Sequence, residues 1–205
     1  KADNKVDLFC IEADYAVKYV DTEYTLDVIK DVGLSKKDLA NAYQYTKDVV
    51  TDSKGKLKGV SWQSTPGGFV YRRSMAKKVL GVSEPDDVQK LISDWDKFDA
   101  VAAKMKAAGY YMLSGYDDAF RAFQDNVKSP WVKGNKIVID PQITRWIEQT
   151  KMYTDKGYNN KASLWSAEST QQMNADGKVF GYFAVGWFYD FCMPHGAGSA
   201  EGDWA

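Results

Sequence analysis

The stretch KGVSWQSTPGGFVYRRSMAKKVLG, residues 58–81, decides the fold of this chain. Two runs of strand-forming residues, 57–63 and 69–72, stand on either side of the break Ser64-Thr65-Pro66-Gly67-Gly68. Because proline has no backbone N–H to donate and glycine weakens a strand, regular structure should be interrupted at residues 64–68. We therefore expect a linker at residues 61–68, where Ser, Thr, Pro and Gly cluster.

Outward from this stretch, short strand patterns alternate with helical patterns. The capping box at Ser35 and the Asp140-Pro141 pair mark helix starts, and Gly109 marks a helix end. Expected strands cover residues 6–12, 57–63, 69–72, 110–113, 137–139 and 179–185. Expected helices cover residues 35–50, 118 to about 123, 141–150 and 166–176. Two further helices are expected to begin near residues 83 and 93. Alternation of this kind predicts an α/β fold.

Two helices show a clear apolar face. In the first, the face holds Trp95, Phe98, Val101, Ala102 and Met105. In the helix that follows Asp140, we expect the buried residues to be Ile143, Trp146, Ile147 and Thr150. For Trp95 and Trp146 a place in the core is therefore the better interpretation.

Composition narrows the classes of function. The 205 residues fit one large domain or two small ones and can bury a substantial core. Basic residues number 27 and acidic residues 28, so the basic excess typical of a nucleic-acid-binding protein is missing. No apolar run in the sequence approaches the roughly 18 residues that a membrane-spanning helix needs.

Cysteine and histidine are scarce. Cys10 and Cys192 are too few for a disulfide framework, and we expect two buried free thiols. A zinc site needs about four ligands, and only Cys192 and His195 lie close together in sequence. A Ser-His-Asp or Cys-His catalyst would have to use His195 in a glycine-rich stretch, and we do not favour that chemistry. We expect no metal and no cofactor.

Four expected strand ends carry an aromatic ring beside hydrogen-bonding side chains. In open α/β sheets, ligands bind beyond the carboxyl ends of strands. An aromatic ring can pack on the apolar face of a sugar, while carboxylates and amides hydrogen-bond its hydroxyls. The pattern favours a sugar site. The four segments are Glu12-Ala13-Asp14-Tyr15, Ser61-Trp62-Gln63-Ser64, Gly115-Tyr116-Asp117-Asp118 and Gly186-Trp187-Phe188-Tyr189-Asp190.

Each candidate also has a plainer interpretation. Asp117 could cap the helix that follows it, Glu12 and Asp14 could be solvated, and Trp62 and Trp187 could be core residues. Paired carboxylates would alternatively suit a glycoside hydrolase, which needs an acid and a base or nucleophile about 5–10 Å apart. A third possibility is an interaction domain without a ligand, in which the aromatic residues all belong to the core.

The motifs of residues 58–81 resemble the crossover segment of extracellular solute-binding proteins of carbohydrate ABC transporters. Phe69-Val70-Tyr71-Arg72-Arg73 is similar to the family's "YY(N/R)K" strand, which leads into a helix ending in "LG". Three further motifs occur in the family's order across nearly the whole chain: residues 7–14 resemble "PDI…D", 94–98 resemble "TWDEF", and 176–187 resemble "GK(V/A)…G(P/S)W". SWQSTPGG replaces the commoner "PY" hinge.

The resemblance implies a periplasmic-binding-protein-like fold with a sugar or oligosaccharide between two lobes. Residues 1–60 would be part of the N-terminal lobe and 61–205 most of the C-terminal lobe, without the family's opening strand, C-terminal return, signal or lipid-anchor cysteine. The protein would be a monomer that acts outside the cytoplasm, as a periplasmic protein or cell-surface lipoprotein. It would hand sugar to an ABC permease without catalysis. The implied ligand contacts are Asp14, Tyr15, Trp62, Gln63, Tyr116, Asp117 and Trp187.

Overall fold

The computed structural model describes residues 6–205, and the chain divides into two compact units. The first unit ends at Ser64, and the second runs from Thr65 to Ala205. The assignment of the two parts to an N-terminal and a C-terminal lobe stays a prediction. Among residues 6–205, no helix combines the length and the apolar character that crossing a bilayer requires.

The first unit contains short helical turns: η1 (Ala13–Tyr15), α1 (Val17–Val20) and α2 (Gln44–Asp48). The expected strands at 6–12 and 57–63 are wrong, since these residues form no strand and Leu57 makes only a single bridge to Thr51. A strand exists only when a neighbouring strand accepts and donates its backbone hydrogen bonds, and neither run has such a neighbour among the described residues.

The expected helix at 35–50 is much shorter than its pattern suggested. The capping box does form, because the Ser35 N–H donates to Asp38 Oδ2 at 2.8 Å and the Asp38 N–H donates to Ser35 Oγ at 3.3 Å. Residues 36–42 then make turns, and only α2 is regular helix. In the described part of the first unit, the buried hydrophobic residues are Ala16, Val20 and Val28. With so little tertiary burial, helix propensity alone does not extend the helix.

The second unit is organised around β1 (Gly67–Tyr71) and β4 (Gly181–Val185), which pair antiparallel with Gly67 opposite Val185. The strands expected at 69–72 and 179–185 are confirmed, although β1 begins inside the expected break at 64–68. Tyr71 also exchanges two backbone hydrogen bonds of 3.0 Å with Ala205. The expected strand at 110–113 is reduced to isolated parallel bridges, Tyr111 to Val179 and Leu113 to Asn159.

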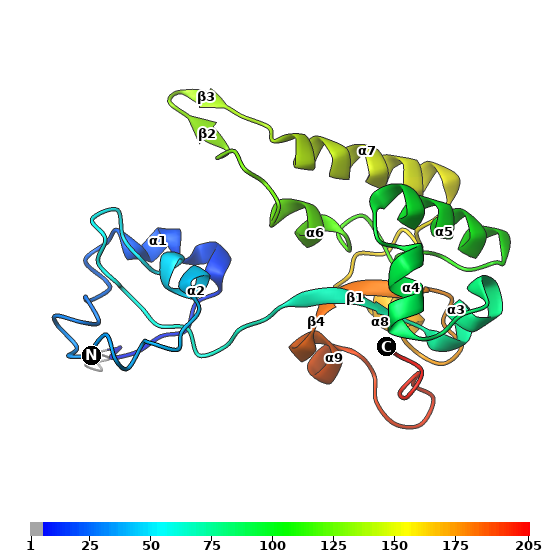
Figure 1. Ribbon diagram of the computed structural model, residues 1–205, viewed down its shortest axis with the longest axis horizontal. Helices are drawn as coiled ribbons and strands as arrows, with labels where there is room; N and C mark the ends of the chain where they lie inside the picture. The colour runs from blue at the N-terminus through cyan, green and yellow to red at the C-terminus, as the bar shows by residue number, and fades with distance from the viewer. Residues whose placement is uncertain (1–5) are drawn as a thin grey trace, which may run out of the picture. The chain divides into compact units, whose positions relative to one another are not determined.

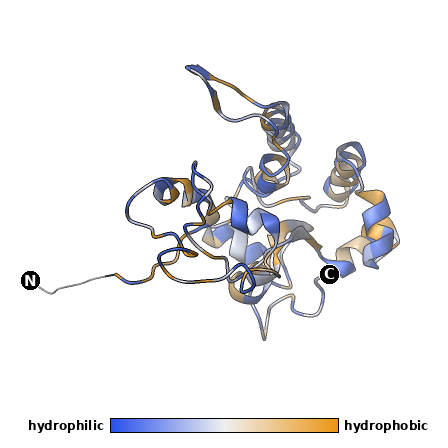
Figure 2. Ribbon diagram, turned by 60° about the vertical axis from the view of Figure 1, so that its left-hand side comes forward, coloured by the Kyte–Doolittle hydropathy of each residue, from blue (hydrophilic) through white to orange (hydrophobic). Residues whose placement is uncertain are grey.

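Helices surround this sheet, and a small hairpin projects from the α6–α7 side (Figure 1). Blue and orange segments alternate along the helices in Figure 2, as expected where one helix face is buried. The helices are α3 (Arg73–Leu80), α4 (Pro85–Leu91), α5 (Trp95–Ala107), α6 (Phe120–Gln124), α7 (Pro141–Lys156), α8 (Ala167–Gln172) and α9 (Gly186–Cys192), and the hairpin strands are β2 (Val132–Lys133) and β3 (Lys136–Ile137).

Local capping signals place most of these helices correctly. The Asp94, Asp140 and Ser166 side chains each accept a backbone N–H of the first turn, and Gly109 follows α5 with a left-handed φ of 84°. Two expectations were wrong: α8 ends at Gln172 instead of near Asp176, and Ile147 is 51% exposed. Although Ile147 lies one turn after Ile143, the buried side of α7 continues through Gln149 and Tyr153, and Ile147 lies outside it.

The core lies on both faces of the sheet. Tyr182 and Ala184 of β4 belong to one buried cluster, while Phe183 between them packs against the other. Successive strand residues point to opposite faces, so β4 joins two hydrophobic layers. The larger layer includes Phe98 and Met105 of α5. Burial on both sides is characteristic of α/β folds.

The buried Arg72 binds the C-terminal residues to the end of β1 through hydrogen bonds and an ion pair. Arg72 Nε donates to Asp203 Oδ2 at 2.5 Å, and its guanidinium also donates to the carbonyls of Asn174 and Ala175. The Arg72 side chain is 6% exposed. Burial raises the pKa of Asp203, but hydrogen bonds from Ser74 and Arg72 outweigh that effect and the pKa is lowered. The carboxylate is therefore held in its charged form.

Candidate functional site

The loop 114–118, which follows the bridge at Leu113, lies directly against residues 159–162. The Ser114 hydroxyl donates to the Ala162 carbonyl at 3.2 Å, and the Ala162 N–H donates to the Ser114 carbonyl at 3.1 Å. A Cβ added at Gly115 would lie 1.9 Å from the Ala162 carbonyl oxygen. The two segments can approach this closely only because residue 115 has no side chain.

Asp118 stabilises this loop by accepting hydrogen bonds from its backbone. Its Oδ2 accepts the Ser114 N–H at 2.5 Å and the Gly115 N–H at 3.0 Å, while Oδ1 has no hydrogen-bond partner among the described residues. Burial raises the pKa of Asp118 to about 7, although the two backbone N–H groups oppose the rise. The neighbouring Asp117 carboxylate adds to the rise. Near neutral pH, Asp118 is thus poised between its neutral and charged forms.

Asp117 connects the loop to the segment that precedes α8. Its Oδ2 accepts the Ser163 hydroxyl at 2.6 Å, and its Oδ1 accepts the Leu164 N–H at 2.9 Å. The N-cap residue of α6 is Ala119, without a side-chain hydrogen bond, so Asp117 does not cap that helix. Both carboxylate oxygens thereby fix residues 163–164 in place. A direct contact between Asp117 and a ligand stays a prediction.

Trp187 lies in the first turn of α9, immediately after β4, and is half-buried. Its ring is parallel to that of Trp165, with an interplanar angle of 11° and ring centroids 6.3 Å apart. Phe188, which is buried, meets both indoles edge-on at 5.6 and 6.2 Å. Trp165 is 65% exposed, so a large part of this aromatic pair faces solvent.

Sequence reasoning missed Trp165. The search for candidates looked at residues that follow strands, and no strand directly precedes Trp165. Its position depends on Asp117, which contacts the two residues before it. The one local signal was a tryptophan directly before the helix cap Ser166, and that pattern alone does not distinguish a ligand contact from a surface residue.

Tyr116 is 54% exposed at the tip of the same loop. Its carbonyl accepts a hydrogen bond from Trp146 Nε1 at 3.0 Å. Trp146 also contacts the Phe120 ring at a centroid distance of 4.8 Å and packs against the larger core cluster. Trp146 and, likewise, Trp95 are therefore core-packing residues, as expected. The structure thus connects Asp117 to Trp187 through residues 163–165, with Tyr116 adjacent to Asp117 in the loop.

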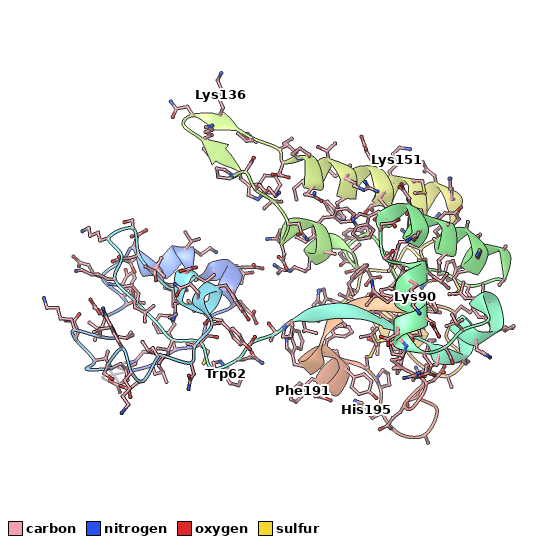
Figure 3. All side chains as sticks on the ribbon, in the orientation of Figure 1. Trp62, Lys90, Lys136, Lys151, Phe191 and His195 are labelled. Carbon is pink, nitrogen blue, oxygen red and sulfur yellow. The ribbon has the colours of Figure 1, made fainter. Side chains whose placement is uncertain are left out.

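The remaining candidates belong to the first unit. Asp14 and Tyr15 lie in η1, where the Tyr15 ring is 52% exposed and Lys18 Nζ is 4.6 Å from its centroid. Trp62 is 84% exposed, which excludes the core interpretation, and Figure 3 shows it on the segment that ends this unit. Gln63 is also exposed. All four stay predictions as ligand contacts.

The two cysteines and the histidine lie in the following surroundings. Cys10 and Cys192 are free, as expected, but neither is fully buried: Cys10 is exposed because the run around it is not a buried strand, and Cys192 is half-buried. The His195 ring lies 3.1 Å from the Tyr189 carbonyl and 3.6 Å from the Glu201 carboxylate. Within residues 6–205, no group of three or more His, Cys, Asp or Glu side chains could hold a metal ion.

A family model described as "Bacterial extracellular solute-binding protein" matches residues 1–200. The chain belongs to this family. Comparison of this solute-binding protein with curated proteins found no match.

Solved structures confirm the expected α/β, periplasmic-binding-protein-like fold. A crystal structure titled extracellular solute-binding protein family 1 matches with a TM-score of 0.74 and 18% identity, over 87% of this chain and 46% of that one. The galacto-N-biose-/lacto-N-biose I-binding protein of the Bifidobacterium longum ABC transporter matches with a TM-score of 0.65 and 21% identity, over 88% and 44%. A chitin oligosaccharide binding protein matches with a TM-score of 0.66 and 19% identity, over 93% of this chain and 48% of that one. The chain therefore spans less than half the length of these structures.

Proposed function

We propose that this solute-binding protein captures a sugar or oligosaccharide outside the cytoplasm and delivers it to an ABC permease. The observation that carries the proposal is Trp187: a half-buried indole at the carboxyl end of β4, parallel to the exposed ring of Trp165. The solved relatives support the ligand class, since two of them are named for binding lacto-N-biose and chitin oligosaccharides.

The proposed mechanism is conformational and involves no bond-breaking step. A ligand that contacts two lobes only in the closed form shifts the population toward that form. The residues proposed as ligand contacts are Asp14, Tyr15, Trp62, Gln63, Tyr116, Asp117 and Trp187. The protein acts as a monomer, in the periplasm or as a cell-surface lipoprotein.

The test is calorimetric titration of the full-length protein with lacto-N-biose, chitobiose, galactobiose, maltose and their monosaccharides. Stacking on an aromatic ring contributes roughly 1–3 kcal/mol by analogy with other stacked rings. Trp187→Ala should therefore weaken binding by at least about tenfold. Trp131→Ala is the matched control, because that tryptophan is 52% exposed beside the β2–β3 hairpin. Its removal should leave affinity unchanged.

Two results would overturn the proposal. Wild-type affinity in Trp187→Ala would place the site on another element. Chromatography of the same sugars after prolonged incubation should show no product, and cleavage of many sugar molecules per protein molecule would instead indicate a hydrolase that uses paired carboxylates.

A further inference from the structure

Resting on the proposed function, we propose that Trp165 is a second ligand-stacking ring of the same site, positioned by Asp117, and that it makes the site selective for ligands of two or more sugar rings. Nothing in the sequence pattern assigns a role to Trp165. Its role follows from how the ring is exposed, what holds it, and what lies beside it.

The Trp165 ring is both exposed and held in place. At 65% exposure it contributes little to the core. Even so, it is parallel to Trp187 at 6.3 Å and meets buried Phe188 edge-on at 5.6 Å. An exposed indole supported in this way loses little conformational entropy when a ligand packs on it, which favours binding.

Asp117 fixes the backbone that carries this ring. Its two carboxylate oxygens accept from Ser163 Oγ and from the Leu164 N–H, the residues directly before Trp165. Asp117 itself is fixed by the loop that Asp118 closes through the backbone N–H groups of residues 114 and 115. Asp117 therefore acts through Trp165 as a positioning residue, whatever contact it also makes with a ligand.

A polar groove lies beside the backbone segment that carries Trp165. The groove has a volume of about 440 Å³, within the range of small-molecule sites, and Ser163 and Ser166 on either side of Trp165 contribute to its wall. Its other lining groups include Asn160, Lys161 and Glu168. These amide, ammonium and carboxylate groups can hydrogen-bond sugar hydroxyls. One sugar ring on Trp187 would occupy the aromatic surface only in part, and a second ring on Trp165 would bring its hydroxyls to the groove.

The experiment compares disaccharides with their monosaccharides in the full-length protein, by calorimetric titration of wild type, Trp165→Ala and Trp187→Ala. Trp165→Ala should weaken disaccharide binding at least about tenfold and change monosaccharide binding by less than about threefold. Trp187→Ala should weaken both. Since Trp165 is largely exposed, the variant should retain the wild-type unfolding midpoint, which is measured in parallel.

A double-mutant cycle tests the role of Asp117. If Asp117 acts through the indole, Asp117→Ala should weaken disaccharide binding by a clearly larger factor in wild type than in Trp165→Ala, where only its own ligand contact is left to lose, and Asp117→Asn should restore part of the loss. Additive effects would overturn the positioning role. Wild-type disaccharide affinity in Trp165→Ala, with Trp187→Ala still impaired, would overturn this inference and leave the proposed function standing. Absence of binding by every sugar would overturn the proposed function itself.

Discussion

Replacing Asp118 with asparagine should abolish a fall in stability that the second unit shows as pH rises. Burial raises the pKa of Asp118 from 3.8 to about 7. Between about pH 4 and pH 7, the native protein therefore keeps a proton that the unfolded chain has released. Stability falls with rising pH wherever the native state binds more protons than the unfolded state. The contribution is fully favourable below about pH 4 and is lost as pH rises through about 7.

The size of the effect follows from the same numbers. A tenfold change in proton affinity corresponds to about 1.4 kcal/mol, so the rise from 3.8 to about 7 amounts to about 4 kcal/mol at most. The amide of the Asp118→Asn variant would keep a side-chain oxygen to accept the Ser114 and Gly115 N–H groups and would carry no titrating proton. Relative to wild type, this variant should gain stability progressively from about pH 4.5 to 7.5.

Urea unfolding at closely spaced pH values across that window measures the difference. Asp203→Asn is the matched control, because the pKa of Asp203 is lowered and its stabilisation is lost only as pH falls below the ordinary carboxyl range. That variant should be destabilised by an amount that hardly changes across the window. Parallel stability curves for Asp118→Asn and wild type would refute the reasoning.

Three further outcomes are expected. Gly115→Ala should destabilise the second unit by roughly 1–3 kcal/mol, because its Cβ would collide with neighbouring backbone, whereas Gly68→Ala meets open space and should have little effect; urea midpoints compare them. Arg72→Met should cost roughly 3 kcal/mol in the same assay, since it leaves a partly buried carboxylate without its cation. Thiol titration of the unfolded, unreduced protein should give two equivalents from Cys10 and Cys192, and zero would indicate a disulfide.

Helix ends were predictable because their causes are local. The side chains of Asp94, Asp140 and Ser166 contact backbone N–H groups two or three residues away, so a short window of sequence contains the whole interaction. A short window of sequence does not predict how far a helix extends when its length depends on tertiary packing. The capping box at Ser35 forms, yet the helix does not extend from it, because the first unit buries too little to stabilise it.

Strands were predictable only where a partner exists. The apolar runs at 6–12 and 57–63 resemble those at 69–72 and 179–185, and only the latter two pair. Hydrophobic patterning describes which face a strand would bury, not which strand would lie beside it. The candidate site shows the same limit: Trp187 could be found from the strand before it, whereas Trp165 depends on a contact with Asp117 from a distant segment.

The pairing of β1 with β4 has a consequence for how the chain folds during synthesis. Helices α3 to α8 are made between the two strands, and each can begin to form from local contacts as it leaves the ribosome. β1 has no partner until β4 follows, and Tyr71 gains its last hydrogen bonds only from Ala205. Throughout translation of the unit, β1 is an unpaired edge that other nascent chains could join.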